Sequence, residues 1–176
     1  YLHSGFSSTI SNSFSSPSAS LTGVGWDGTN VLSTDAVSDI IYLHSGFSTT
    51  ISNSFSSPST APTGVGWDGT NVLSGDNTLD RIYLHSGFST TISNSFSSPS
   101  TLPLGVGWDG TNVLSGDNGL SRIYLHSGFS STISNSFSSP SNGLRGVADD
   151  SWSGSGGTPP AVVVSPKPTL LYMGAG

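Results

Sequence analysis

Hydrophobic and polar residues alternate along short segments of this chain, and the clearest alternation lies near its middle. Over Thr91–Ser97, an isoleucine, an asparagine and a phenylalanine alternate with serines. A period of two is typical of a β-strand that buries one of its faces. Pro99 follows closely, and a proline cannot donate a backbone hydrogen bond to a neighbouring strand. The pattern therefore predicts a strand that ends before Pro99.

Three further segments have the length and composition of short strands. They are Gly64–Trp67, Val72–Ser74 and Ile82–Ser86. An Asp-Gly pair that begins at Asp68 separates the first two, and this pair favours tight hairpins because both residues tolerate a positive φ. Gly75-Asp76-Asn77 has the composition of a second turn. Four strands are thus predicted within one short stretch of chain.

The whole pattern returns at a constant interval along the chain. The sequence Tyr-Leu-His-Ser-Gly-Phe begins at Tyr1, Tyr42, Tyr83 and Tyr124. The sequence Gly-Val-Gly-Trp-Asp-Gly-Thr-Asn-Val-Leu-Ser begins at Gly23, Gly64 and Gly105, with the same spacing. A fixed period of this length indicates a repeat architecture, and four strands per period fit one propeller blade. We predict an all-β propeller of about four four-stranded blades over residues 1–152.

The two ends of the chain bear on how such a ring closes. Tyr1 stands where the third strand of a repeat begins, and Gly146–Asp150 retains part of the first-strand pattern. Residues 153–176 read as a Gly/Ser/Pro linker with a C-terminal strand segment, at Ala161–Val164 or Thr169–Met173. We expect the N- and C-terminal segments to share one composite blade. A propeller closed between chains and a β-solenoid are the alternatives.

The repeat resembles a known type. Gly64-Val-Gly-Trp-Asp-Gly-Thr-Asn-Val-Leu-Ser-Gly-Asp, followed by Arg81-Ile82, is similar to the NHL-type β-propeller repeat. The resemblance covers residues 23–141, with Tyr1–Ser18 as half a blade, and the first copy departs from it with Ile40 in place of the arginine. It implies a propeller that serves as a platform for protein or RNA interactions, or more rarely as an enzyme.

The composition of the chain argues against several classes of structure and partner. All ten acidic residues are aspartates, and the near absence of Glu and Lys argues against helices. With only four Lys and Arg and a net charge of −6, the chain is a poor ligand for the phosphate backbone of nucleic acids. Its hydrophobic stretches are too short to span a membrane. A Ser/Thr-rich surface with little charge favours an extracellular or virion-surface location.

Histidine is the first candidate for chemistry. The four histidines occur once per repeat, at His3, His44, His85 and His126. If a ring brought them together they could ligate a metal. The alternative is that each one forms hydrogen bonds within its own blade, to an Asp or a Ser. No His-x-x-x-His pair accompanies them, which favours the alternative, and we predict neither a bound metal nor a cofactor.

Tryptophan and aspartate give further candidates. The tryptophans could be stacking platforms for sugars, but their place beside valines favours blade core, for Trp26, Trp67 and Trp108 alike. The aspartates that follow them could belong to a hydrolytic triad, yet Asp before Gly is ordinary turn chemistry. Asp76 and Asp117 could bind Ca²⁺ through their carboxylates, but a role in forming turns is the commoner one for such residues.

Repetition itself argues against catalysis. An active site needs one asymmetric arrangement with tuned pKa values, whereas nearly identical repeats create nearly identical surroundings. We therefore expect a non-enzymatic structural or recognition module whose partner is a protein, a glycan or a second copy of itself. A multivalent carbohydrate-binding lectin is the first alternative. A lyase or hydrolase of NHL-like type, with a metal held by the histidines, is the second.

Overall fold

The computed structural model describes residues 1–4, 7–140 and 143–147, and these residues form an all-β fold. Three four-stranded antiparallel sheets follow one another along the chain. Blade 1 contains β3 (Leu21–Trp26), β4 (Val31–Asp35), β5 (Ile40–His44) and β6 (Ile51–Ser56). Blade 2 contains β7 (Pro62–Trp67), β8 (Val72–Asp76), β9 (Arg81–His85) and β10 (Ile92–Ser97). Blade 3 contains β11 (Pro103–Trp108), β12 (Val113–Asp117), β13 (Arg122–His126) and β14 (Ile133–Ser138). A two-stranded sheet of β1 (Leu2–His3) and β2 (Ile10–Asn12) precedes them.

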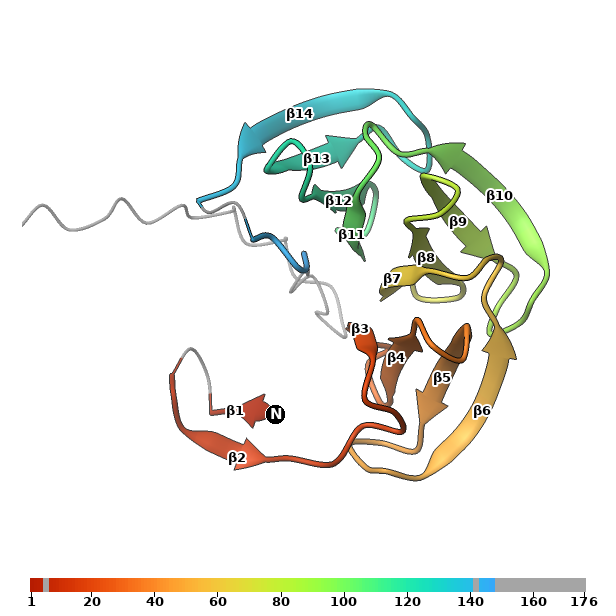
Figure 1. Ribbon diagram of the computed structural model, residues 1–176, viewed down its shortest axis with the longest axis vertical. Coiled ribbons are helices and arrows are strands. Elements are labelled where there is room, and N and C mark those ends of the chain that lie inside the picture. Colours follow the sequence, from red (N-terminus) through yellow and green to blue (C-terminus); the bar gives the residue numbers. More distant parts are fainter. Residues whose placement is uncertain (5–6, 141–142, 148–176) are drawn as a thin grey trace, which may run out of the picture.

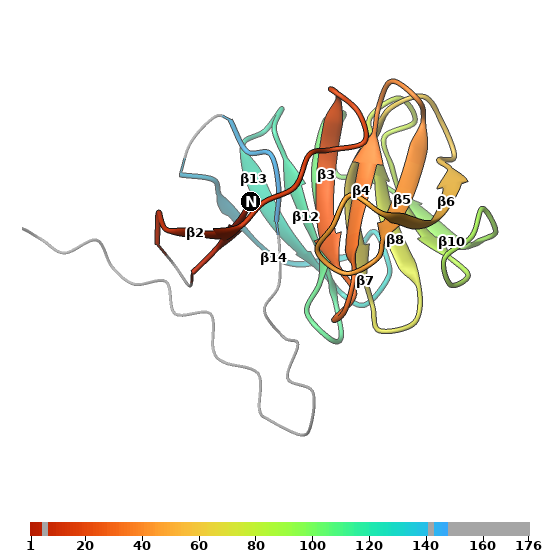
Figure 2. The same cartoon turned by 90° about the horizontal axis from the view of Figure 1, so that it is seen from below.

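The three blades are arranged around a common centre, as Figure 1 shows. The inner strand of each blade is β3, β7 or β11, and the outer strand is β6, β10 or β14. Seen from below, neighbouring blades lie side by side (Figure 2). This radial arrangement confirms the predicted β-propeller fold, because a β-solenoid would stack its strands along one axis. No helix among the described residues is long and apolar enough to cross a membrane.

Blade 2 contains all four strands predicted for one repeat, with ends shifted by one or two residues. The turn predicted at Gly75-Asp76-Asn77 is placed wrongly, because Gly75 and Asp76 belong to β8 and Asp76 pairs with Arg81. The turn occupies the next four residues and ends at Asp80, whose φ is 51°. Aspartate tolerates this left-handed conformation better than most residues, which explains how the later turn is accommodated.

The hydrophobic core lies between blades rather than within them. One cluster joins Leu32, Ile41 and Phe55 of blade 1 to Val65 and Val72 of blade 2. The same five positions of the next repeat form the cluster between blades 2 and 3: Leu73, Ile82, Phe96, Val106 and Val113. Burial of one such side chain contributes roughly 1.5–3 kcal/mol. Each blade therefore depends on its neighbour for most of its apolar burial.

At the centre, the inner strands approach one another backbone to backbone. A Cβ atom added to Gly64 would lie 2.7 Å from the backbone nitrogen of Val106 in the next blade. At the preceding blade, a Cβ atom on Gly23 would lie 2.6 Å from the Thr63 carbonyl oxygen. Real Cβ atoms do not approach backbone atoms this closely. Glycine is thus required at these positions because the next strand occupies the place of a side chain.

Threonine hydroxyl groups fasten neighbouring inner strands together. The Thr22 hydroxyl donates to the Pro62 carbonyl at 2.6 Å, and the Thr63 hydroxyl donates to the Pro103 carbonyl at 2.5 Å. Both bonds cross from one blade to the next between residues 40 positions apart. Leu104 occupies the corresponding position in β11 and has no hydroxyl to donate. The threonine bond is therefore a feature of the first two inner strands and is not repeated by the third.

The start of a fourth blade lies where the composite-blade prediction places it. A Cβ atom on Gly105 would lie 2.5 Å from the Val147 backbone nitrogen, which repeats the approach of Gly64 to Val106. Gly146 and Val147 thus occupy the position of a first strand. The segments predicted to supply the second strand, Ala161–Val164 or Thr169–Met173, lie outside the described residues, as does the rest of 153–176. Closure by a shared blade, within one chain or between chains, stays a prediction.

The close approach at the centre yields a stability prediction. Gly64→Ala forces a methyl group against backbone atoms, and overpacking of this kind costs about 1–3 kcal/mol. Gly119→Ala is the matched control, because its nearest atoms lie at an ordinary 3.5 Å. Urea denaturation should show a lower free energy of unfolding for the Gly64 variant only. Equal stability of both variants would contradict backbone contact at the centre.

Candidate functional site

Each complete blade buries one histidine against one serine. The His44 Nε2 lies 2.9 Å from the Ser33 hydroxyl, and the pairs His85–Ser74 and His126–Ser115 have distances of 2.9 and 2.8 Å. All three histidines are completely buried. The serine is placed by strand register, because Ser33 pairs with Tyr42 and residues 42 and 44 share a face of β5.

The hydrogen bonds also fix the form of the imidazole. The His44 Nδ1 lies 3.0 Å from the Ser48 carbonyl oxygen, which can only accept. Nδ1 therefore carries the proton, and Nε2 accepts from Ser33. Burial lowers the pKa of His85 to about 4, although the Ser89 carbonyl acts in the opposite direction. Burial likewise lowers the pKa of His44 and His126, so these imidazoles are neutral near pH 7.

A phenylalanine from the preceding repeat covers each of these imidazoles. The ring centroids of Phe55 and His85 are 4.9 Å apart, and Phe55 also contacts Phe88 edge-on at 4.8 Å. The same stack recurs for Phe14 on His44 and for Phe96 on His126. Each histidine is thus sealed inside its own interface between repeats, and the histidines do not come together at one site.

His3 differs from the other three histidines. It is exposed at the end of β1, and no serine hydroxyl lies opposite it among the described residues. The part of the chain that the structure describes also has no cluster of three His, Cys, Asp or Glu side chains suited to a metal ion.

A serine of the same blade was one of the two partner types expected for the histidines, but the particular serines and the covering phenylalanines were not identified from sequence. Both partners nevertheless recur at fixed places in the repeat. The serine stands 11 residues before its histidine in all three blades. The phenylalanine belongs to the Ile-Ser-Asn-Ser-Phe-Ser segment of the preceding repeat. The constant spacing was therefore present in the sequence, but it does not by itself indicate contact.

The aspartates that follow the tryptophans cap turns. The Asp68 carboxylate accepts from the backbone amides of Thr70 at 2.8 Å and Asn71 at 2.6 Å. Asn71 in turn accepts from the Gly87 amide at 3.0 Å, which ties this turn to the loop after β9. Asp27 and Asp109 make the same bonds in their blades. Their carboxylates are occupied by backbone amides, as the turn interpretation expects.

The second pair of aspartates is also held in turns. The Asp76 carboxylate accepts from the amides of Thr78 and Leu79 at 2.9 and 2.8 Å, and from the Ser59 hydroxyl. Asp117 accepts from the Leu120 amide at 2.7 Å and from the Ser100 hydroxyl. Both serines lie on the link between blades. These carboxylates therefore join the link to the blade that follows it.

The three tryptophans of the repeats, Trp26, Trp67 and Trp108, do not share one environment. Trp67 and Trp108 are half-buried and pack against the two hydrophobic clusters. Trp26 is 47% exposed and does not fit the prediction that all three belong to the blade core. Among the described residues, no complete blade precedes blade 1. Trp26 therefore lacks the neighbouring blade that partly covers Trp67 and Trp108, although the surrounding sequence is the same.

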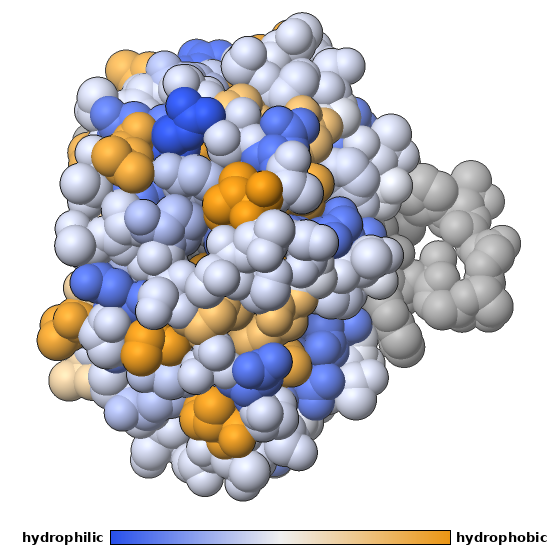
Figure 3. All heavy atoms as spheres, turned by 90° about the vertical axis from the view of Figure 1, so that its right-hand side faces the viewer, coloured by the Kyte–Doolittle hydropathy of each residue, from blue (hydrophilic) through white to orange (hydrophobic). Residues whose placement is uncertain are grey.

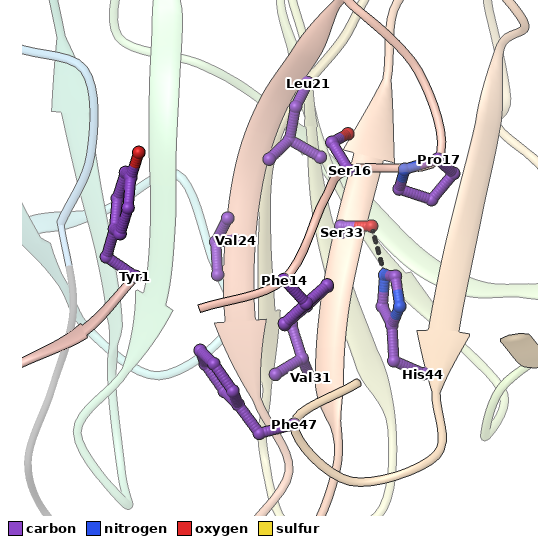
Figure 4. Close-up of a pocket in the computed structure, with 10 residues that line it drawn as sticks. All are labelled: Tyr1, Phe14, Ser16, Pro17, Leu21, Val24, Val31, Ser33, His44 and Phe47. Carbon is purple, nitrogen blue, oxygen red and sulfur yellow. Dashed lines mark hydrogen bonds between the residues drawn. The ribbon is translucent and has the colours of Figure 1, made fainter. Parts of the chain in front are cut away.

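A cavity of about 250 Å³ lies on this uncovered face of blade 1 (Figure 4). Val24 and Val31 line it, and their counterparts Val65 and Val72 are buried in the cluster between blades 1 and 2. Phe14 and the Ser33–His44 pair complete the wall. The lining is largely apolar around the serine and the imidazole. This pocket is an inter-blade interface whose second side is supplied only in part, by Tyr1, Phe14, Ser16 and Pro17 of the N-terminal segment. It was not predicted from sequence.

A second cavity of about 250 Å³ lies at the centre of the ring. Inner-strand glycines and valines line it together with Thr22, Leu104 and Arg145, which occupy equivalent positions of three repeats. Arg145 is the charged residue of this lining. The first and last inner segments of the described chain thus face one central space.

Comparison with solved structures identifies the class of protein. The chain matches the computationally designed Ika4 protein with a TM-score of 0.53 and 11% identity, over 73% of this chain and 80% of that one. It matches the glutaminyl cyclase of Myxococcus xanthus with a TM-score of 0.52 and 13% identity, over 72% of this chain and 51% of that one. For the designed Ika8 protein the TM-score is 0.51 and the identity 12%, over 73% and 39%.

These likenesses, together with the radial blades, define the protein as a β-propeller. The chain spans about half or less of the length of the cyclase and of Ika8. No protein-family model and no curated protein matches the sequence. Identities this low show the fold alone.

The tryptophan environments yield a second stability prediction. Trp67→Ala removes a ring packed against the cluster between blades 1 and 2, and we expect a loss of about 3 kcal/mol, the low end of the range for a large buried aromatic. Trp26→Ala is the matched control, since it removes the same side chain from the same sequence at an uncovered face. Chemical denaturation should show the larger loss for Trp67. A loss of equal size at Trp26 would contradict the difference in packing.

The buried histidines yield a prediction of pH dependence. The unfolded chain binds a proton at His85 near its ordinary pKa of 6.5, whereas the folded chain does so only near pH 4. The contribution of His85 to stability is therefore fully present above about pH 6.5 and falls as the pH drops toward 4, by about 1.4 kcal/mol per pH unit.

Urea denaturation at pH 7.5 and at pH 5 measures this loss. A His85→Asn variant should lose less stability between the two pH values than the unsubstituted protein does. A His3→Asn variant, changed at an exposed side chain, should behave like the unsubstituted protein. A His85 variant with an unaltered pH dependence would show that this imidazole is not buried in its neutral form.

Proposed function

We propose that the chain is a non-enzymatic structural or recognition module, displayed outside the cell or on a virion surface. One observation carries the proposal. In each complete blade, the histidine and two aspartates are engaged in holding the blade together, as His85, Asp68 and Asp76 illustrate. These three side chains, which are suited to acid–base or metal chemistry, are thus used for structure. What each repeat offers to a partner is its exposed surface, in several copies.

Repetition suits such a role. Several equivalent surfaces on one rigid ring let weak individual contacts add up to strong binding, since the second contact forms at a high effective concentration. The resemblance of Gly64–Asp76 and Arg81-Ile82 to NHL-type repeats supports the same assignment, because that type serves mostly as an interaction platform. The net charge of −6 favours a protein partner over a nucleic acid.

A lectin is the second candidate, and the tryptophans favour it. Each stands at the end of an inner strand, next to the Asp-Gly turn, and none is fully buried. Half-exposed indole rings at equivalent positions could stack on sugar rings, one per blade. The enzyme alternative has less support, because the three buried histidines lie in separate interfaces between repeats.

A glycan array probed with the full chain separates these functions. Under our proposal no glycan is retained above the level of a blank spot. Binding that disappears in Trp26→Ala, while the variant keeps its fold by circular dichroism, would replace the proposal with the lectin. Calorimetric titration with zinc tests the enzyme: stoichiometric binding at micromolar affinity or tighter, abolished by His85→Ala, would favour a metal site.

A further inference from the structure

The outer strands form the rim of the ring, and all carry the same sequence. Ile-Ser-Asn-Ser-Phe-Ser makes up β6, β10 and β14 in full, and it begins at β2. Each of these strands is the outermost of its sheet, so one side of its backbone has no partner strand within its blade. The sequence has no charge and no proline, the two residue classes that usually protect an exposed edge. Short uncharged segments of this kind pair readily with one another.

Backbone amides in the second half of each outer strand alternate between facing the sheet and pointing away from it. The Ser57 amide donates to the Asp39 carbonyl at 2.7 Å, so Ser57 faces β5. The direction alternates along an antiparallel strand, so the Phe55 amide also faces β5, while the amides of Ser54, in the middle of the strand, and of Ser56 point outward. An outward amide on a rim strand is the group that a strand from another molecule would bind first.

A side chain already occupies this amide. The Asn53 Oδ1 accepts from the Ser54 amide at 2.8 Å. The same bond, at the same distance, recurs in each of the three remaining copies of the segment. It runs from Ser13 to Asn12, from Ser95 to Asn94 and from Ser136 to Asn135. Four repetitions indicate a regular feature of the repeat rather than an accident of one loop.

The asparagine of each outer strand makes no other side-chain hydrogen bond among the described residues. Asn53, Asn94 and Asn135 are exposed, so they contribute little to packing. Asparagine is also one of the residues depleted in β-strands, where a β-branched residue would be more stable. The blade thus retains an unfavourable residue at the centre of its rim, and its one described side-chain bond is to the outward amide.

A local irregularity lies next to the asparagine. The pairing of β5 with β6 shifts between Leu43 and His44, which leaves Ser52 as an extra residue, and the Ser52 hydroxyl donates to the Leu43 carbonyl at 3.1 Å. The bulge twists the start of the strand and interrupts its flat edge. The remaining regular part of the edge runs from Asn53 onward, and the asparagine holds the first of its outward amides, that of Ser54.

We propose that these asparagines prevent the rim from pairing with the rim of a second copy of this chain. The partner that the free edge would accept is an extended, uncharged strand with the same sequence in antiparallel orientation. Because every blade carries the same strand, any blade of one molecule could pair with any blade of another. A single such contact joins two molecules, but the edges of β6, β10 and β14 on each molecule let the contacts continue from molecule to molecule and build open aggregates.

The surface of the rim is consistent with this role. The face that carries β6 and β10 is mostly neutral in hydropathy, with hydrophobic spots that are separated from one another (Figure 3). Ile51 and Ile92 are 37% and 38% exposed. No large apolar patch is needed for association here, because main-chain hydrogen bonds would drive it. The role of the asparagines is independent of the proposed function, since it concerns the backbone of the rim alone.

Three triple variants test the proposal, each substituted at positions 53, 94 and 135. Asn→Val removes the acceptor, Asn→Gln keeps the amide but moves it out of reach of the next backbone amide, and Asn→Asp keeps an acceptor at the same distance. We expect the Val and Gln variants to form oligomers at concentrations at least tenfold below any at which the unsubstituted protein does so. Light scattering after size-exclusion chromatography, with thioflavin T fluorescence, measures this. The Asp variant should keep the mass of the unsubstituted protein.

Two results would overturn the proposal. If the Val and Gln variants keep the mass of the unsubstituted protein, the side-chain bond does not protect the rim. If the Gln variant keeps that mass while the Val variant associates, polarity protects the rim and the bond to the amide does not. Circular dichroism and urea denaturation keep the test valid, since the exposed substitutions should leave the fold intact and should not lower its stability. For a variant that fails to fold, the single Asn94→Gln substitution in the central blade answers the same question.

Discussion

The close approach of backbones at the centre is the constraint on which the rest of this structure depends. Where β3, β7 and β11 converge there is no room for side chains, and Gly23, Gly64 and Gly105 meet it by having none. The valines that follow two of these glycines, Val65 and Val106, can then reach sideways into the neighbouring blade. A chain that places its side chains between blades has little left to bury within a single blade, so each repeat needs a neighbour in order to be stable.

Much of the fold could be predicted from sequence because the signals are local and repeated. Alternation around Phe96 and the Asp-Gly pair at Asp68 each act over a few residues, and the structure confirms the strand and the turn. The later turn was misplaced because Asp76 has turn composition but lies in a strand, from which its carboxylate reaches forward. Local composition does not distinguish these two cases.

The site was less predictable, since its partners lie in other strands and other repeats. That His44 meets a serine on β4 and a phenylalanine from the preceding repeat is a result of strand register and blade packing. Trp26 and Trp67 have identical neighbours in sequence yet differ in exposure, because only one of them has a complete blade in front of it. Position in the array, which no local pattern records, decides between them.

The bonds and ring contacts between blades also have a consequence for how this protein folds and changes in evolution. Thr22 contacts Pro62, and Phe55 contacts His85, so each such contact links one repeat only to the next. In arrays in which each repeat contacts only its neighbours, structure can nucleate in any repeat and spread along the chain. Gain or loss of one whole repeat by recombination would leave every one of these contacts intact. The number of blades is therefore a property that such a gene can vary without redesigning a single interface.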